Sequence, residues 1–127
     1  MVNKRKILAV AVVLVIAAAH LVPVGRLLPA GWSSIYASYF SDIAIPFAFY
    51  FLLCAADRTT PFLRIWSVRT AIAFVLPAFA ETCQYFGIPL LGSTFDPFDY
   101  LMYAIGTIAA ALIDKFVFSK VFRFWDE

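Results

Sequence analysis

The chain has 127 residues, of which 64% are apolar and 14% charged, and its formal net charge is +2. A soluble domain of this length has too little interior to bury so large an apolar fraction. Composition therefore excludes an ordinary soluble domain and predicts an integral membrane protein with a single transmembrane domain and no nucleic-acid partner.

Four apolar stretches approach the length of about 20 residues that a bilayer-crossing helix needs. We therefore predict an all-α fold, an integral membrane four-helix bundle. Cys54 and Cys83 both fall inside these stretches, which favours buried, reduced thiols over a disulfide framework. The predicted spans are residues 7–24, 39–56, 67–86 and 97–118.

The first span has an alternative interpretation. The segment MVNKRKILAVAVVLVIAAAH also has the basic, apolar and Ala-rich parts of a signal peptide. We favour a retained span, because the apolar run continues through Leu21 and Val22 and the second span needs a partner.

The basic residues predict the orientation of the four spans. Nine of the ten Lys and Arg residues fall on one side, where the net charge is +5, and Arg26 alone lies on the other side, where it is −3. The positive-inside rule then places both termini in the cytoplasm of a plasma or inner membrane. The nine bases are Lys4, Arg5, Lys6, Arg58, Arg64, Arg69, Lys115, Lys120 and Arg123.

Turn residues mark the connections between the spans. The segment VPVGRLLPAGWSS, with two Pro and two Gly residues, is predicted to be an irregular loop. Thr60 and Pro61 are suited to the N-cap and first position of a helix, so the third helix is expected to begin early.

Polar residues gather near the outer ends of the spans in this arrangement, whereas the cytoplasmic half has few internal ones. Carboxylates, an amide, an imidazole and a guanidinium at one level predict a binding site. The candidate residues are His20, Arg26, Asp42, Glu81, Gln84, Asp96 and Asp99.

Glu81 is the residue of this set that is hardest to explain by structure alone. It lies six residues before Gly87, which is about 9 Å along a helix and within or at the edge of the hydrocarbon. An ionised carboxylate there needs a partner, and we expect Arg26 or His20 to supply it. Gln84 lies on the same helix face as Glu81. Pro77, four residues before Glu81, has no N–H and so frees the backbone carbonyl of Ala73.

Simple structural roles compete with the binding interpretation at other positions. In the segment FDPFD, Asp96 is suited to be an N-cap, with Pro97 and Asp99 at the first and third helical positions. Gly106 permits close helix packing. An interfacial role is as reasonable as a site role for Asp42, and is the more frequent one for a histidine such as His20.

The segment from Glu81 to Gly106 resembles the signature of VanZ-like membrane proteins. Its Glu81-x-x-Gln84, short loop, Thr94-Phe95-Asp96-x-x-Asp99 and Gly106 match the polar pattern of that family. Many members have an arginine where this chain has Ser93 and an asparagine where it has Tyr103. The resemblance implies a small helical bundle linked to teicoplanin-type glycopeptide resistance or another cell-envelope role.

The resemblance leaves several functions open. The leading interpretation is an envelope protein whose outer cluster binds a glycopeptide, a lipid head group or a cell-wall precursor. The alternatives are a small proton-coupled transporter or channel subunit, and a hydrolase or transferase that uses Glu81 and Asp99. The enzyme is less favoured because the chain has a single histidine and no serine elbow or HExxH motif. No motif predicts a metal or another cofactor.

Overall fold

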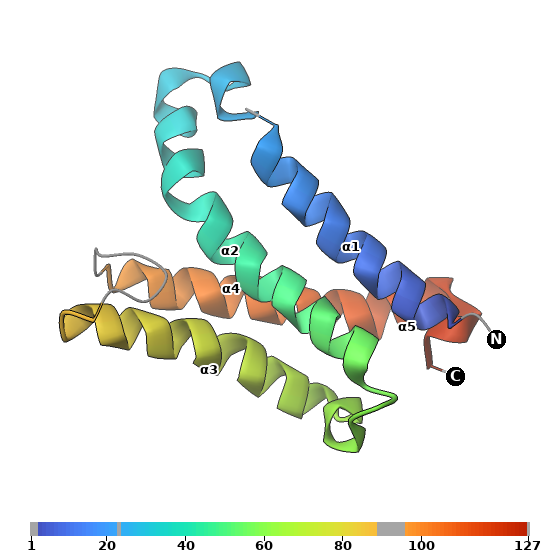
Figure 1. Ribbon diagram of the computed structural model, residues 1–127. Coiled ribbons are helices and arrows are strands. Elements are labelled where there is room, and N and C mark those ends of the chain that lie inside the picture. Colours follow the sequence, from blue (N-terminus) through green and yellow to red (C-terminus); the bar gives the residue numbers. More distant parts are fainter. Residues whose placement is uncertain (1–2, 23, 89–95, 127) are drawn as a thin grey trace.

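The computed structural model describes residues 3–22, 24–88 and 96–126, and these residues form helices and turns without any strand, as predicted for an all-α fold. Four long helices dominate the molecule (Figure 1). Their bounds are Lys4–Leu21 for α1, Ala30–Ala56 for α2, Trp66–Tyr85 for α3 and Phe98–Leu112 for α4.

Shorter helical segments complete the chain. Helix α4 continues through a six-residue π-helix, η3 (Ile113–Phe118), into α5 (Ser119–Val121). Three 3-10 helices follow α1, α2 and α5, and they are η1 (Val24–Leu27), η2 (Pro61–Arg64) and η4 (Arg123–Asp126).

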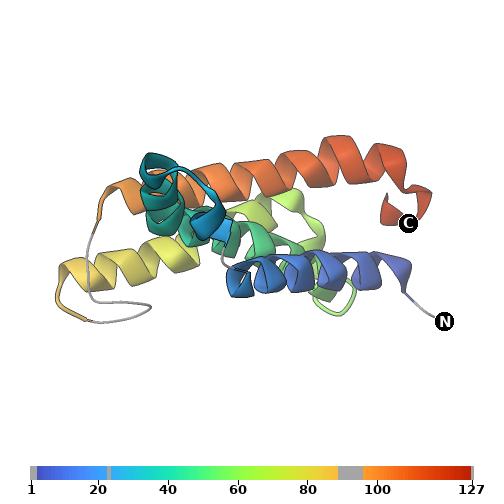
Figure 2. The same ribbon diagram turned by 90° about the horizontal axis from the view of Figure 1, so that it is seen from above.

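Helix α2 occupies the centre of the arrangement and contacts α1, α3 and α4. Figure 2 shows α1 and α4 on opposite sides of α2. We call the end with both chain termini and the connection between α2 and α3 (residues 57–65) the terminal end. The end where α3 finishes and α4 begins is called the loop end (Figure 1).

The buried apolar core lies toward the terminal end. Phe51 and Trp125 are fully buried there, with ring centroids 6.1 Å apart, and the Phe118 ring lies 4.9 Å from the Trp125 ring. Small residues, including Ala9, Ala73 and Ala110, let the helices approach this aromatic group closely. Cys54 is a free thiol in the same core, as predicted, whereas Cys83 is free but half-buried.

Helix α2 begins earlier than the second predicted span. The chain turns into it directly after Pro29, which occupies the N-cap position with extended backbone. The predicted loop is therefore shorter, because Gly31 sits inside the first turn without interrupting the helix. Pro46 is buried within α2 and removes a backbone donor, which explains the bend in the first half of α2 in Figure 1.

The end of α3 is set by Gly87, whose φ of +82° lies in the left-handed region. The Ile88 N–H donates to the Cys83 carbonyl (2.8 Å) and the Gly87 N–H to the Gln84 carbonyl (3.0 Å). This pair of bonds is a Schellman motif, which satisfies carbonyls that the helix end leaves open. Helix α3 therefore ends within one residue of the end predicted for the third apolar stretch.

The start of α4 depends on Asp96. Its Oδ1 accepts a hydrogen bond from the Phe98 N–H (3.0 Å), but the N-cap position belongs to Pro97, so the predicted N-cap assignment of Asp96 is wrong by one residue. Pro97 lies one position earlier than expected, immediately before the first helical residue, and Asp99 is in the first turn. At the other connection, Thr60 and Pro61 begin only the short helix η2, because Ile65 is extended and α3 starts after it.

Gly106 brings α4 against the backbone of α2. A Cβ atom added to Gly106 would lie 2.9 Å from the carbonyl carbon of Ile43 and overlap its oxygen. A side chain of any size therefore forces the two helices apart, which confirms the predicted packing role of this glycine.

Two helical stretches of the described residues are long and apolar enough to cross a membrane. They are Tyr39–Ala56, within α2, and Phe98–Val121, formed by α4, η3 and α5. They coincide with the second and fourth predicted spans.

Candidate functional site

The loop end carries a cluster of four carboxyl groups, three from helices and one from the residue before the N-cap of α4. It is here called the carboxyl cluster and consists of Asp42, Glu81, Asp96 and Asp99. Glu81 is its buried member, with 1% of its surface exposed. The Asp96 N–H donates to Glu81 Oε1 (2.7 Å), and the Tyr103 hydroxyl donates to Oε2 (3.2 Å). Glu81 thus joins α3 to the start and the second turn of α4.

Asp42 and Asp99 form the half-buried part of the carboxyl cluster. Their side chains hydrogen-bond to each other, and both lie close enough to Glu81 and Asp96 to interact electrostatically. Two carboxylates in contact repel each other unless a proton or a cation lies between them. A cation seated between them would take the place of that proton.

The partners of Glu81 differ from the expected ones. His20 Nδ1 donates to the Ile16 carbonyl (2.8 Å), and its Nε2 shares a hydrogen bond with Ser41 Oγ (3.0 Å), so His20 joins α1 to α2 instead. Arg26 is exposed in η1, and Figure 1 shows η1 well away from the loop end. The structure therefore brings together Asp42, Glu81, Asp96 and Asp99 but leaves His20 and Arg26 outside the carboxyl cluster.

The other predicted positions fall around the carboxyl cluster. Gln84 is half-buried one turn after Glu81 on α3, and Pro77 is buried one turn before it. Tyr103, where the VanZ-like pattern has asparagine, supplies a hydrogen bond to Glu81. Ser93, Thr94 and Phe95 lie outside the described residues.

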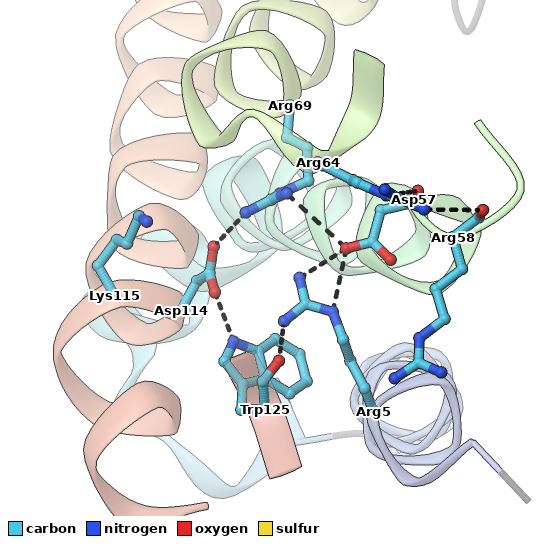
Figure 3. Close-up of a pocket in the computed structure, with 8 residues that line it drawn as sticks. All are labelled: Arg5, Asp57, Arg58, Arg64, Arg69, Asp114, Lys115 and Trp125. Atoms are coloured by element: carbon cyan, nitrogen blue, oxygen red, sulfur yellow. Dashed lines mark hydrogen bonds and ion pairs between the residues drawn. The ribbon is translucent and has the colours of Figure 1, made fainter. Parts of the chain in front are cut away.

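A second polar site, absent from the sequence prediction, lies at the terminal end (Figure 3). Asp114 accepts hydrogen bonds from the Tyr50 hydroxyl, from Arg69 Nη2 (2.7 Å) and from the Trp125 indole N–H. Arg69 also donates to the Leu63 carbonyl (2.7 Å). Both Asp114 and Arg69 are 2% exposed, so their charges neutralise each other inside the protein.

Arg5 forms the second half of this terminal network. Its Nε and Nη2 both donate to Asp57 Oδ2, at 3.0 and 2.7 Å, and its Nη1 donates to the Trp125 carbonyl. The guanidinium also lies over the Trp125 ring, 4.3 Å from its centroid. Asp57 is 3.9 Å from Arg69 and so links the two ion pairs.

The terminal network corrects the prediction that the cytoplasmic half holds few internal polar groups. Arg5 and Arg69 are two of the nine bases that predict the cytoplasmic side. Both are buried, and they pair with acids 52 and 45 residues away in the sequence. The sequence feature that could have predicted the terminal network is the presence of two acids, Asp57 and Asp114, among the nine basic residues of this end.

The chemistry of the two sites differs. The ion pairs of the described residues all belong to the terminal network, so the acids of the carboxyl cluster have no basic partner among them. No group of three metal-ligating side chains occurs in the described part of the chain. Carboxyl groups in contact that lack a basic partner attract a proton or a cation.

Comparison with known proteins adds no relative to this description. No protein-family model, no curated protein and no solved structure matches the chain. The VanZ-like resemblance accordingly depends on the segment from Glu81 to Gly106 alone.

Proposed function

We propose that this protein is a VanZ-like, multi-pass protein of the plasma or inner membrane, with both termini in the cytoplasm and the loop end outside. In this orientation the carboxyl cluster faces the outer leaflet. We propose that it contributes to the cell envelope by binding an amine-bearing group of a glycopeptide, a lipid head group or a cell-wall precursor.

The observation that supports this proposal is the hydrogen-bonded pair of Asp42 and Asp99. Glu81 has both carboxylate oxygens engaged by Asp96 and Tyr103, so its role is to position the other acids. The half-buried pair is the open part of the carboxyl cluster, and two carboxyl groups in contact attract a cation that displaces their proton.

The binding proposal is tested by glycopeptide tolerance in a susceptible host that expresses the full chain. We expect the wild-type protein to raise tolerance to a teicoplanin-type drug, and Asp99→Asn and Glu81→Gln to abolish the increase at equal membrane abundance. Arg123→Gln, which removes an exposed charge at the other end, serves as the control. Unchanged tolerance in both carboxyl variants would contradict the assignment of this site.

The orientation is tested separately by reporter fusions after Thr59 and after Ile88, both exposed residues of connections. The proposal requires a cytoplasmic signal after Thr59 and an outer signal after Ile88. A cytoplasmic signal after Ile88 would place the carboxyl cluster on the wrong side for an outer-leaflet ligand.

A second candidate function, a proton-coupled transporter or channel subunit, is favoured by buried polar groups between the two ends. Thr107 is 1% exposed, and its hydroxyl has no partner in the described part of the chain. It lies four residues after Tyr103 and seven before Asp114, so the three lie along one side of the continuous helix formed by α4 and η3. A transporter should show pH-gradient-dependent flux in liposomes that Thr107→Val reduces, and absence of any flux would exclude it.

A further inference from the structure

A cavity of about 690 Å³ opens within the terminal network (Figure 3). Its volume is in the range of ligand pockets in proteins. Eight residues line it, two of them acidic and five cationic, so the lining has a net charge of +3. The cations are Arg5, Arg58, Arg64, Arg69 and Lys115.

The two acids of the lining are already neutralised. Asp57 is paired with Arg5 and Asp114 with Arg69, each at 2.7 Å. Arg64 is exposed and donates to the backbone carbonyls of Asp57 and Arg58, at 3.4 and 3.5 Å. Lys115 takes part in none of the ion pairs of the described residues, which leaves an excess of positive charge at the cavity.

Two details of the cavity wall indicate a functional site: a buried donor without an acceptor and an irregular helix. Arg69 Nε is buried and has no hydrogen-bond acceptor among the described residues, although Nη1 and Nη2 of the same guanidinium both donate hydrogen bonds. Buried donors of charged groups are normally satisfied. In addition, Asp114 and Lys115 belong to the π-helix η3, a distortion that is frequent at functional sites.

We propose that this basic cavity binds a phosphate group. A phosphate monoester carries nearly two negative charges and three acceptor oxygens, which suits several cations better than a single carboxylate does. Arginine forks and a lysine point charge are the usual phosphate partners in proteins. The phosphate belongs either to a lipid head group at the membrane surface or to a soluble phosphate compound.

The proposal concerns the end of the molecule opposite the carboxyl cluster and is independent of the function proposed for that cluster. It assigns Arg64 and Lys115 as the residues that contact the phosphate from the rim of the cavity. Arg69 offers its Nε–H, which lacks an acceptor among the described residues, while Arg5 and Arg69 remain paired with Asp57 and Asp114.

The test measures binding of two probes to the purified full chain in a neutral detergent. Dioctanoyl phosphatidic acid represents the lipid source and inorganic phosphate the soluble source, with dioctanoyl phosphatidylcholine as the reference head group. We expect saturable binding of phosphatidic acid, and an Arg64→Ala/Lys115→Ala double variant that binds about tenfold more weakly, as expected for lost charge-assisted hydrogen bonds.

A matched control removes the same charge from the same end. Lys120 and Arg123 are exposed cations outside the cavity lining, so the Lys120→Ala/Arg123→Ala variant should bind within twofold of the wild type. Competition by inorganic phosphate at the same site would show that the phosphate group alone is recognised, which assigns a soluble source. Binding of phosphatidic acid without such competition would assign the lipid head group.

Three results would overturn the proposal. They are the absence of saturable binding of either probe, equal weakening in the two double variants, and equal binding of phosphatidylcholine and phosphatidic acid. Because Arg64 and Lys115 are exposed, their replacement is expected to leave the unfolding transition unchanged, which separates lost binding from lost folding.

Discussion

Removal of the Asp114 carboxylate is the most informative perturbation of the terminal network. Asp114→Ala deprives three buried donors of their acceptor, namely the Tyr50 hydroxyl, Arg69 Nη2 and the Trp125 indole. Arg69, 2% exposed, would keep Asp57 as its nearest acid, at 3.9 Å. Breaking a buried ion pair in this way costs about 3–5 kcal/mol of the free energy of unfolding.

A double variant separates the ion pair from the general effect of a core substitution. In Arg69→Met/Asp114→Leu both charges are absent, so no unpaired charge remains buried. We expect this variant to lose less stability than the two single changes together, with a coupling free energy of about 2 kcal/mol.

The assay is reversible unfolding of the full chain in mixed micelles, followed by the fluorescence of the tryptophans. Lys120→Ala, an exposed substitution, is the control and should change the free energy of unfolding by less than about 0.5 kcal/mol. A loss below about 1 kcal/mol for Asp114→Ala, the range of an exposed ion pair, would refute the reasoning. Strict additivity in the double variant would refute it as well.

Two further predictions concern glycines and use the same unfolding assay. Gly106→Ala should destabilise the protein by about 1–3 kcal/mol, because its Cβ would overlap the backbone carbonyl of Ile43. Gly31→Ala, where a Cβ meets no atom within 4 Å, is the matched control, and equal effects of the two changes would contradict the packing argument. Gly87→Ala should cost about 1 kcal/mol, because φ is +82° at that position; a neutral result would mean that the turn after α3 tolerates another conformation.

Local signals predicted the elements at the loop end well. Gly87 marks the end of α3, and Asp96 followed by Pro97 marks the start of α4, because these residues act on the backbone within a few positions. The clustering of Asp42, Glu81 and Asp99 followed from placing helix ends at one level. The hydrogen-bond partners of Glu81 could not be predicted, because a tyrosine hydroxyl and a backbone N–H carry no charge that marks them in the sequence as partners of a carboxylate.

The terminal network was not predictable from local patterns. Arg69 meets Asp114 only because α3 and α4 pack side by side, and Arg5 meets Trp125 across 120 positions of the chain. A basic residue near a predicted helix end has the same local sequence pattern whether it remains in water or becomes buried. Only the tertiary arrangement separates these two outcomes.

The contacts of Arg5 have a consequence for the order of events during biosynthesis. The residue leaves the ribosome before both of its acceptors, since Asp57 and the Trp125 carbonyl follow 52 and 120 residues later. Two of the guanidinium bonds can form once Asp57 has been made, whereas the bond from Nη1 requires Trp125. The terminal network is therefore completed only after Trp125 has been made, later than the insertion of α1 and α2.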